Sequence, residues 1–213
     1  IMDMIFIQLA SSLLNLPTAT AELQANAPVQ NIDIVNWEQF DYRPKVTFQA
    51  GWNQDGLLLH FHVEEQHILS THTTLEAPAY QDSCVEFFYS PTSDGSYYNL
   101  EMSCTGSLLW HYKTADGQKT TFGEEDLKKI VIETSLPKHT LIDNREGGSW
   151  ELTVFIPAEC LPEGFLKSGR EFTANFYKCG DNTVQKHYLT WAPIDTEKPS
   201  FHQPQCFGKI TLQ

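Results

Sequence analysis

The chain has 213 residues, with 27 acidic side chains against 14 Lys and Arg, and a formal net charge of −13. This charge excludes a surface built to bind nucleic acid or another polyanion. Hydrophobic residues make up 41% of the chain and aromatic residues 12%, which is enough for a packed core and excludes global disorder. No apolar run approaches the ~18–20 residues that cross a bilayer, so we expect no membrane span.

The N-terminal segment, residues 4–16, reads MIFIQLASSLLNL. No Lys or Arg precedes it, which makes it a poor match to a secretory signal. The alternative is an amphipathic helix or irregular arm with Ile5, Leu9 and Leu13 on one stripe, ended by Pro17. We therefore divide the chain into an arm, residues 1–28, and one domain, residues 29–213.

Segments that alternate apolar with polar residues recur along this domain. The first two, Val46–Trp52 and Leu57–Val63, flank a turn at residues 53–56. Eight more strands are predicted at Cys84–Tyr89, Tyr97–Ser103, Ser107–Lys113, Ile130–Thr134, Trp150–Ile156, Phe172–Lys178, His187–Trp191 and Phe207–Leu212.

Helical patterns are short in the same region, at Gly123–Lys129 and in one turn at Pro157–Leu161. About ten short strands with loops of this length favour an all-β fold. Two packed antiparallel sheets, an immunoglobulin-like β-sandwich, suit them better than a small closed barrel.

Three carboxylates, Asp82, Glu86 and Glu101, fall on predicted neighbouring strands or at their edges. Glu86 and Glu101 alternate with apolar residues, so both point away from the apolar face of their sheet. We expect them on an exposed or cleft-facing surface rather than in a desolvated pocket. Solvated carboxylates, hydrogen bonding to a ligand and acid–base catalysis of glycoside hydrolysis all remain open.

Metal and nucleophile motifs are sparse. Five cysteines cannot all pair, and no C-x-x-C spacing occurs, so we expect mostly buried thiols that leave the compartment undecided. His60 and His62 share one strand face, and His67 is the nearest third ligand, which is a weak zinc pattern. The chain has no phosphate-binding loop, G-x-S-x-G elbow or H-E-x-x-H motif.

Three segments carry a resemblance to a known family. They are Gln81–Phe88 with Tyr97–Glu101, then Ala174–Asp181, and then Trp191-Ala192-Pro193 followed by Phe201–Gly208. Their order and spacing resemble the family 9 carbohydrate-binding modules, in particular the stand-alone family-9-like proteins of Bacteroidetes. The similarity covers residues 30–213 and implies a β-sandwich of the kind also seen in DOMON domains.

The resemblance implies a sugar site formed by loops at one edge. In the family, two tryptophans clamp the terminal sugar, and these positions fall on Tyr80 and Phe201. The glutamate that hydrogen bonds to sugar hydroxyls falls on Glu86. Both clamp positions stay aromatic and can stack on a sugar ring, although Phe201 lacks the indole N–H.

Other polar positions of the family differ in this chain. Arginine and asparagine positions fall on Glu101 and Ser103, and the arginine after the clamp falls on His202. A further arginine falls within one residue of Lys186, at Gln185 by strict counting. Loss of planar guanidinium donors predicts a changed affinity or ligand. Family relatives hold structural calcium, so calcium is an implied cofactor without ligands that the sequence can place.

These observations favour non-catalytic binding of a mono- or oligosaccharide, with Tyr80 and Phe201 stacking on it and Glu86, Glu101, Ser103, Lys186 and His202 nearby. A separate glycoside hydrolase is the expected protein partner, because no enzyme domain is attached. The location is not determined by the sequence, and the carbohydrate role alone favours a periplasmic or extracellular one over a cytoplasmic one. The alternatives are a sugar-processing enzyme that uses Glu86 and Glu101, and a sandwich kept as an interaction domain without sugar binding. We expect Trp191 to belong to the core.

Overall fold

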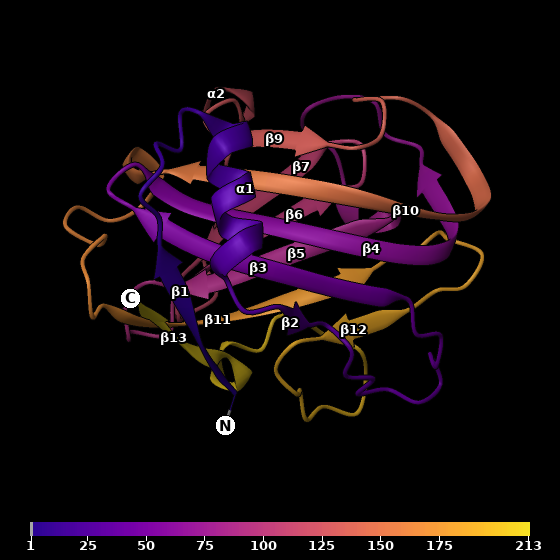
Figure 1. The fold of residues 1–213 in the computed structure, drawn as a ribbon. Coiled ribbons are helices and arrows are strands. Elements are labelled where there is room, and N and C mark those ends of the chain that lie inside the picture. Colours follow the sequence, from indigo (N-terminus) through magenta and orange to yellow (C-terminus); the bar gives the residue numbers. More distant parts are fainter. Residues whose placement is uncertain (1) are drawn as a thin grey trace.

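The computed structural model describes residues 2–213 and shows two stacked β-layers (Figure 1). The layer that we call sheet A has the order β8 (Lys119–Thr121), β7 (Leu108–Lys113), β6 (Tyr97–Ser103), β5 (Cys84–Ser90), β11 (Glu171–Cys179) and β13 (Gly208–Leu212), with β12 (Tyr188–Thr190) beside β11. Sheet B has the order β3 (Lys45–Asn53), β4 (Gly56–Ser70), β10 (Ile142–Pro157) and β9 (Val131–Thr134), with β2 (Gln30–Asn31) beside β3. Within each layer all neighbours are antiparallel.

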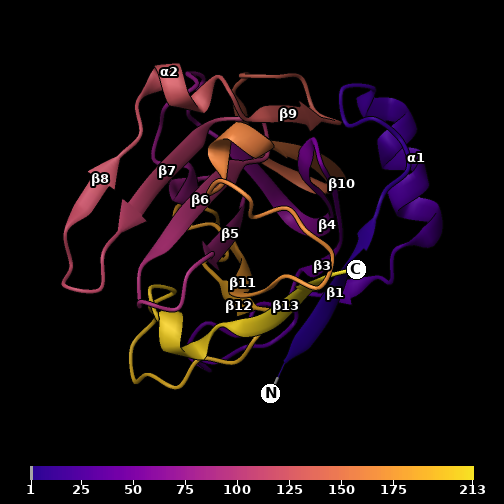
Figure 2. The same cartoon turned by 90° about the vertical axis from the view of Figure 1, so that its left-hand side faces the viewer.

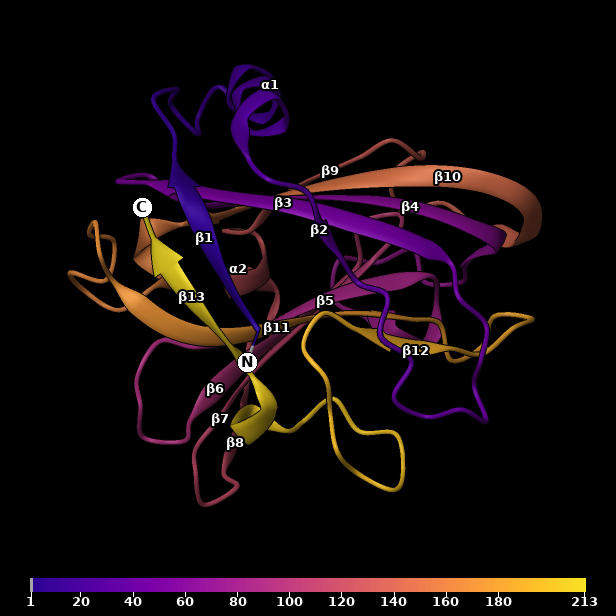
Figure 3. The ribbon, with the colours of Figure 1, turned by 60° about the horizontal axis from the view of Figure 1, so that its bottom comes forward.

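A strand at the N-terminus joins the two layers. β1 (Asp3–Gln8) pairs in parallel with β13 through residues 3–6 and with β3 through residues 7–8. Figure 3 shows β1 lying between β13 and β3. Because one strand pairs with both layers, the sandwich is closed along this edge.

The expected N-terminal helix over residues 4–16 is wrong in its position. Met4 and Phe6 are buried while Ile5 is 55% exposed, which is the two-residue period of a strand. The helix, α1 (Leu16–Asn26), begins where we expected one to end, and Pro17 lies in its first turn. Proline suits this position because the first N–H groups of a helix have no partner within it.

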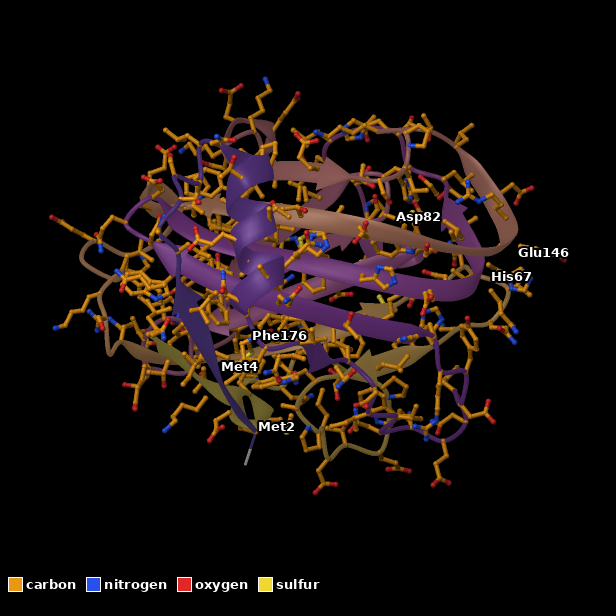
Figure 4. The ribbon with its side chains drawn as sticks, viewed as in Figure 1. Met2, Met4, His67, Asp82, Glu146 and Phe176 are labelled. Carbon is orange, nitrogen blue, oxygen red and sulfur yellow. The ribbon has the colours of Figure 1, made fainter. Side chains whose placement is uncertain are left out.

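The core lies between the layers and follows the alternation of the strands. Leu57, Leu59, Phe61 and Val63 of β4 face it, as do Phe172, Ala174 and Phe176 of β11. Figure 4 labels Phe176, whose ring stacks on Phe48 of the opposite layer with centroids 4.0 Å apart. The expectation for Trp191 is confirmed, because it is 1% exposed and packs so closely on Gly208 that any side chain there would collide with its ring.

Both layers also have apolar groups on their outer faces. Helix α1 covers the outer face of sheet B (Figure 2). There Leu23 packs with Leu58 and Phe155. On the outer face of sheet A, Phe88 and Tyr177 pack with Trp37, Phe201 and Phe207 from the loops. In Figure 3 the loops before β13 lie on the side of β5 and β11 that faces away from β3 and β4. The outer face of sheet A is therefore covered in part.

All ten predicted strands are present, and the all-β sandwich is confirmed. The expected helical segments appear as α2 (Glu124–Leu127) and a 3-10 turn at Ala158–Cys160, and further 3-10 turns lie at Ala79–Gln81 and Pro204–Cys206. Besides β1, the analysis missed β2 and β8, which have two and three polar residues and so no apolar alternation to detect. Among residues 2–213, no helix has the length and apolar character needed to cross a membrane.

Candidate functional site

A cavity of about 360 Å³ opens on the outer face of sheet A. Strands β5, β6 and β7 form its floor, and the loops around residues 80, 181 and 200 form its walls. The lining residues are Tyr80, Glu86, Glu101, Leu109, His111, Lys113, Lys119, Cys179, Asp181, Tyr188, Pro199, Ser200, Phe201 and His202. Five of the seven predicted site residues are among them: Tyr80, Glu86, Glu101, Phe201 and His202.

The floor follows from strand register. Glu86 on β5 lies directly opposite Glu101 on β6, and Glu101 lies opposite Leu109 on β7. All three point away from the core because their sequence neighbours Val85, Leu100 and Leu108 point into it. Strand alternation thus placed the two glutamates on the correct face.

Both glutamates face a cavity, as one form of the expectation had it, but the expectation that they are not desolvated is wrong. Glu86 is 2% exposed and Glu101 is 5% exposed, because the loops carrying Phe201 and Phe207 cover the outer face of sheet A. Asp82, the third carboxylate, lies outside the cavity lining. Its two oxygens accept hydrogen bonds from the backbone N–H groups of Thr71 and His72 and from the Thr71 hydroxyl. Asp82 is therefore a turn-stabilising residue.

Burial changes the acidity of the floor. Loss of hydration raises the pKa of Glu86 well above its ordinary value, and the neighbouring Cys179 and Glu101 raise it further. Burial also raises the pKa of Glu101 to about 7, although the hydrogen bond that the Asn99 amide donates at 2.9 Å acts in the opposite direction. The floor is thus a pair of acids that hold their protons more strongly than exposed carboxyl groups.

Two lysines and a histidine form one wall, and none of them was predicted from the sequence. His111 and Lys113 share the outward face of β7 with Leu109, and Lys119 on β8 lies opposite Lys113. The period-two pattern of β7 was the available signal, since it puts Leu109, His111 and Lys113 on the same face as Glu101. These lysines supply charged donors in a cavity from which the family's arginines are absent.

His202 lies at the same wall as a neutral acceptor or donor. Burial lowers its pKa to about 4, and the nearby Lys113 lowers it further in the same direction. Its Nδ1 lies 2.9 Å from the hydroxyl oxygen of Tyr97. The structure therefore keeps an uncharged imidazole at the cavity.

The aromatic residues differ in how much surface they offer. The Phe201 ring stacks on Tyr177, with centroids 4.2 Å apart and an angle of 11°, and the residue is 8% exposed. One face of Phe201 is thus occupied by protein. Tyr80 and Tyr188 are half-buried and line the cavity as well. Tyr188 was not predicted, because strand β12 is only three residues long and its faces are hard to assign.

Two predicted site residues lie outside the lining. Ser103 is fully buried, and its Oγ accepts a hydrogen bond from the backbone N–H of Ser107 at 2.9 Å. Its hydroxyl supports the β6–β7 turn. Lys186 places its Nζ 5.9 Å from the ring centroid of Phe40 and 5.8 Å from that of Tyr188. Lys186 is therefore near Tyr188, which lines the cavity, but is not itself a lining residue.

The histidine pattern does not gather a metal site. His60 Nδ1 lies 2.8 Å from the Thr153 hydroxyl and its Nε2 lies 3.1 Å from Glu151 Oε1. His67 lies at the far end of β4, opposite Glu146 in the register of β4 and β10 (Figure 4). Within residues 2–213, the group that brings three metal-ligating side chains together is Cys84, Glu86 and Cys179. Two of its three donors are sulfur, so it does not suit calcium, which takes oxygen ligands. All five cysteines are free thiols, as expected.

Comparisons with known proteins identify solved structures that are similar to this chain. A Bacteroides uniformis protein to which carbohydrate binding is ascribed is 29% identical, with a TM-score of 0.91 and coverage of 99% of both chains. A family 9 carbohydrate-binding module from Caldicellulosiruptor kristjanssonii has the same fold in a glucose complex, at 14% identity, TM-score 0.59, and coverage of 100% of this chain and 96% of that one. Its cellotriose complex gives 13% identity, TM-score 0.58, and coverage of 100% and 94%.

A search of curated proteins finds no match. The model of carbohydrate-binding family 9 matches residues 18–212, which is most of the chain. The chain belongs to carbohydrate-binding family 9, a family of non-catalytic binding modules.

Proposed function

We propose that the cavity on the outer face of sheet A holds the end of a saccharide chain. The observation that carries this proposal is the meeting, in one cavity of about 360 Å³, of aromatic rings with paired acids and lysines. Small-ligand sites typically combine an apolar wall with a few polar groups that fix orientation. No turnover is part of the proposal, because family membership makes carbohydrate binding without catalysis the function of this fold.

Each wall has a role in this proposal. Tyr80, Tyr188 and the accessible part of Phe201 pack against the C–H face of a sugar ring. Protonated Glu86 and Glu101 can each donate one hydrogen bond and accept others, and Lys113 donates from the opposite side. Ser103 and Lys186, which lie outside the lining, support the site without touching the sugar.

The relatives guide the choice of ligand. Glucose and cellotriose are the sugars in the complexes of the Caldicellulosiruptor module. We infer that this chain takes a glucose-type ring, and that the changed polar residues alter affinity more than the kind of ring. We also propose that binding serves a separate glycoside hydrolase by raising its local concentration on a shared polysaccharide.

Calorimetric titration of the purified chain with glucose and cellotriose tests the site. Tyr80→Ala and Phe201→Ala should each weaken binding by about 1–3 kcal/mol, because each removes a stacking surface. Phe201→Ala should also lower the melting temperature, since that ring packs on Tyr177, whereas Tyr80→Ala should not.

Tyr42→Ala is the matched control, because Tyr42 is a half-exposed aromatic residue outside the cavity lining. Its titration curve should match the wild type. If Tyr80→Ala binds both sugars as tightly as the wild type, Tyr80 does not contact sugar. Absence of binding to glucose, cellotriose and a glycan array would overturn the proposed function.

A further inference from the structure

The cavity floor contains two thiols that the saccharide proposal does not use, and they lie against Glu86, which that proposal treats only as a hydrogen-bonding group. The Sγ atoms of Cys84 and Cys179 and a carboxylate oxygen of Glu86 all lie within 4.8 Å of one another. The Cys179 Sγ is 2.9 Å from Glu86 Oε2, and the Cys84 Sγ is 3.9 Å from the same oxygen. The three side chains are therefore directed at a common point.

Strand geometry explains this convergence. Cys84 on β5 and Cys179 on β11 lie directly opposite each other in the register of these antiparallel strands. Figure 2 shows β5 and β11 side by side. Glu86 lies two residues further along β5 and so has the same face as Cys84. The cluster rests on two central strands of sheet A, which fix its position more tightly than loops would.

The partners of Glu86 are unusual for a buried carboxyl group. Within residues 2–213, its side-chain hydrogen-bond partners are the two thiols alone, and it forms no ion pair. Without a charged partner the buried carboxyl group keeps its proton, and a metal ion is one of the partners that would let it carry a charge. The two thiols are weak donors and give little compensation.

The donor set indicates which ion would fit. Thiolate ligands select soft or borderline cations, and zinc binds sulfur at ~2.3 Å and carboxylate oxygen at ~2.0–2.2 Å. Two ligands of one tetrahedral zinc ion thus lie about 3.3–3.8 Å apart. The three ligand atoms lie within 4.8 Å of one another, and the two sulfurs are 2.9 Å and 3.9 Å from Glu86 Oε2, so small side-chain movements would bring them to these separations.

We propose that Cys84, Glu86 and Cys179 form a binding site for a thiophilic divalent cation such as Zn²⁺ or Cd²⁺. The three side chains supply two sulfur ligands and one oxygen ligand. A fourth position faces the cavity, because Cys179 and Glu86 line it. On binding, the ligands release their protons to solvent, and no oxidant or reductant is needed. The proposal does not depend on sugar binding.

Titration of the reduced, metal-free chain with Cd²⁺ tests the site directly. Cadmium bound to thiolates gives a ligand-to-metal charge-transfer absorption in the ultraviolet, and we expect it to saturate at one ion per chain. Calorimetry with Zn²⁺ should give the same stoichiometry, and Zn²⁺ should raise the melting temperature of the wild type.

Variants separate this site from other thiols and from surface histidines. Cys84→Ala, Cys179→Ala and Glu86→Gln should each lower the Zn²⁺ affinity at least ~10-fold, and the cysteine variants should reduce the cadmium absorption. Cys104→Ala, which removes a buried thiol on the core face of sheet A, and Cys160→Ala, which removes a half-buried one, should bind as the wild type does.

Three results would overturn the proposal. The first is a wild-type chain that gives no thiolate–cadmium absorption, a measurement that needs no variant to fold. The second is unchanged Zn²⁺ affinity in folded Cys84→Ala and Cys179→Ala. The third is thiol counting that finds Cys84 and Cys179 joined as a disulfide in the freshly purified protein.

Discussion

Two buried glutamates, Glu65 and Glu86, have nearly the same exposure and very different surroundings. Glu65 is 5% exposed and faces the space between the layers. It accepts hydrogen bonds from Trp150 Nε1 at 2.8 Å and Ser83 Oγ at 3.1 Å, and its carboxylate lies 3.3 Å from Lys178 Nζ. Glu86 is 2% exposed on the outer face of sheet A, beside a cavity, and among residues 2–213 its side-chain hydrogen-bond partners are two thiols.

The Glu65 network is complete within the protein. Lys178 also donates to the carbonyl oxygen of Cys179 at 3.0 Å and to His187 Nε2 at 2.8 Å. Burial and the lysine charge hold the pKa of His187 well below its ordinary value, so it is a neutral acceptor. A carboxylate with every partner present is a structural group, whereas the carboxyl group of Glu86 has capacity left for a ligand.

The largest predicted effect comes from a variant that breaks the network of Glu65 and Lys178. Lys178→Met should destabilise the fold by about 3–5 kcal/mol, because it leaves a buried carboxylate without its cation. Urea unfolding followed by circular dichroism measures the change. The double variant Lys178→Met with Glu65→Gln should recover part of the loss, since no unpaired charge remains. A single variant that unfolds at the wild-type urea concentration would show that Glu65 does not need Lys178.

A smaller effect on stability is expected at the cavity floor, where Glu86 and Glu101 lie, and it depends on pH. The folded chain holds the proton of Glu101 up to a pKa of about 7, against an ordinary value of 4.5. Between these values the folded state binds more protons than the unfolded state, so stability falls as pH rises through this window. The expected fall is on the order of 3 kcal/mol from this group. Glu86 acts in the same direction, because its pKa is also raised.

Glu101→Gln sharpens this prediction. The amide oxygen can still accept from Asn99, and the variant has no charge to bury near Glu86 and Asp181. Its stability, measured by urea unfolding from pH 4 to pH 8, should fall less than that of the wild type. Parallel curves for the two proteins would mean that Glu101 does not titrate in this window.

The fold was largely accessible from the sequence because strand alternation is a local signal. The ten predicted strands each have enough apolar residues at period two to mark a face. Segment 4–8 failed because Met4, Ile5 and Phe6 are all apolar, so the exposure of Ile5 between two buried residues gave no alternation in the sequence to distinguish a strand from a helix. Its pairing with β13, which lies at the other end of the chain, is a long-range contact without a local signature.

The site could be predicted only in part from the sequence, because alternation is a local signal. Alternation fixed the face on which Glu86 and Glu101 lie, but burial on that face depends on loops that close over it. Phe201 and Phe207 come from the end of the chain and pack on Phe88 and Tyr177, which no periodicity predicts. The same holds for Cys84 and Cys179, which are distant in sequence and meet only through the β5–β11 register.

The smallest predicted effect comes from replacing a lysine with methionine at the cavity that contains Glu86. Lys113 faces the cavity from β7, and it forms no ion pair with Glu86 or Glu101 among the described residues. Lys113→Met should therefore change stability by less than about 1 kcal/mol, in contrast to Lys178→Met. It should weaken cellotriose binding by about 0.5–1.5 kcal/mol through one lost hydrogen bond.

Lys119→Met serves as the neighbouring control, because Lys119 lies on the exposed strand β8. Its ammonium group is hydrated there, so we expect it to contribute less to sugar binding than Lys113 does. It should change cellotriose binding less than Lys113→Met does in the same calorimetric titration. If Lys113→Met instead unfolds the chain as readily as Lys178→Met, Lys113 compensates the buried acids of the floor. The cavity floor would then resemble the Glu65 network, in which a lysine compensates a buried acid. Its carboxyl groups would have no hydrogen-bonding capacity left for a ligand.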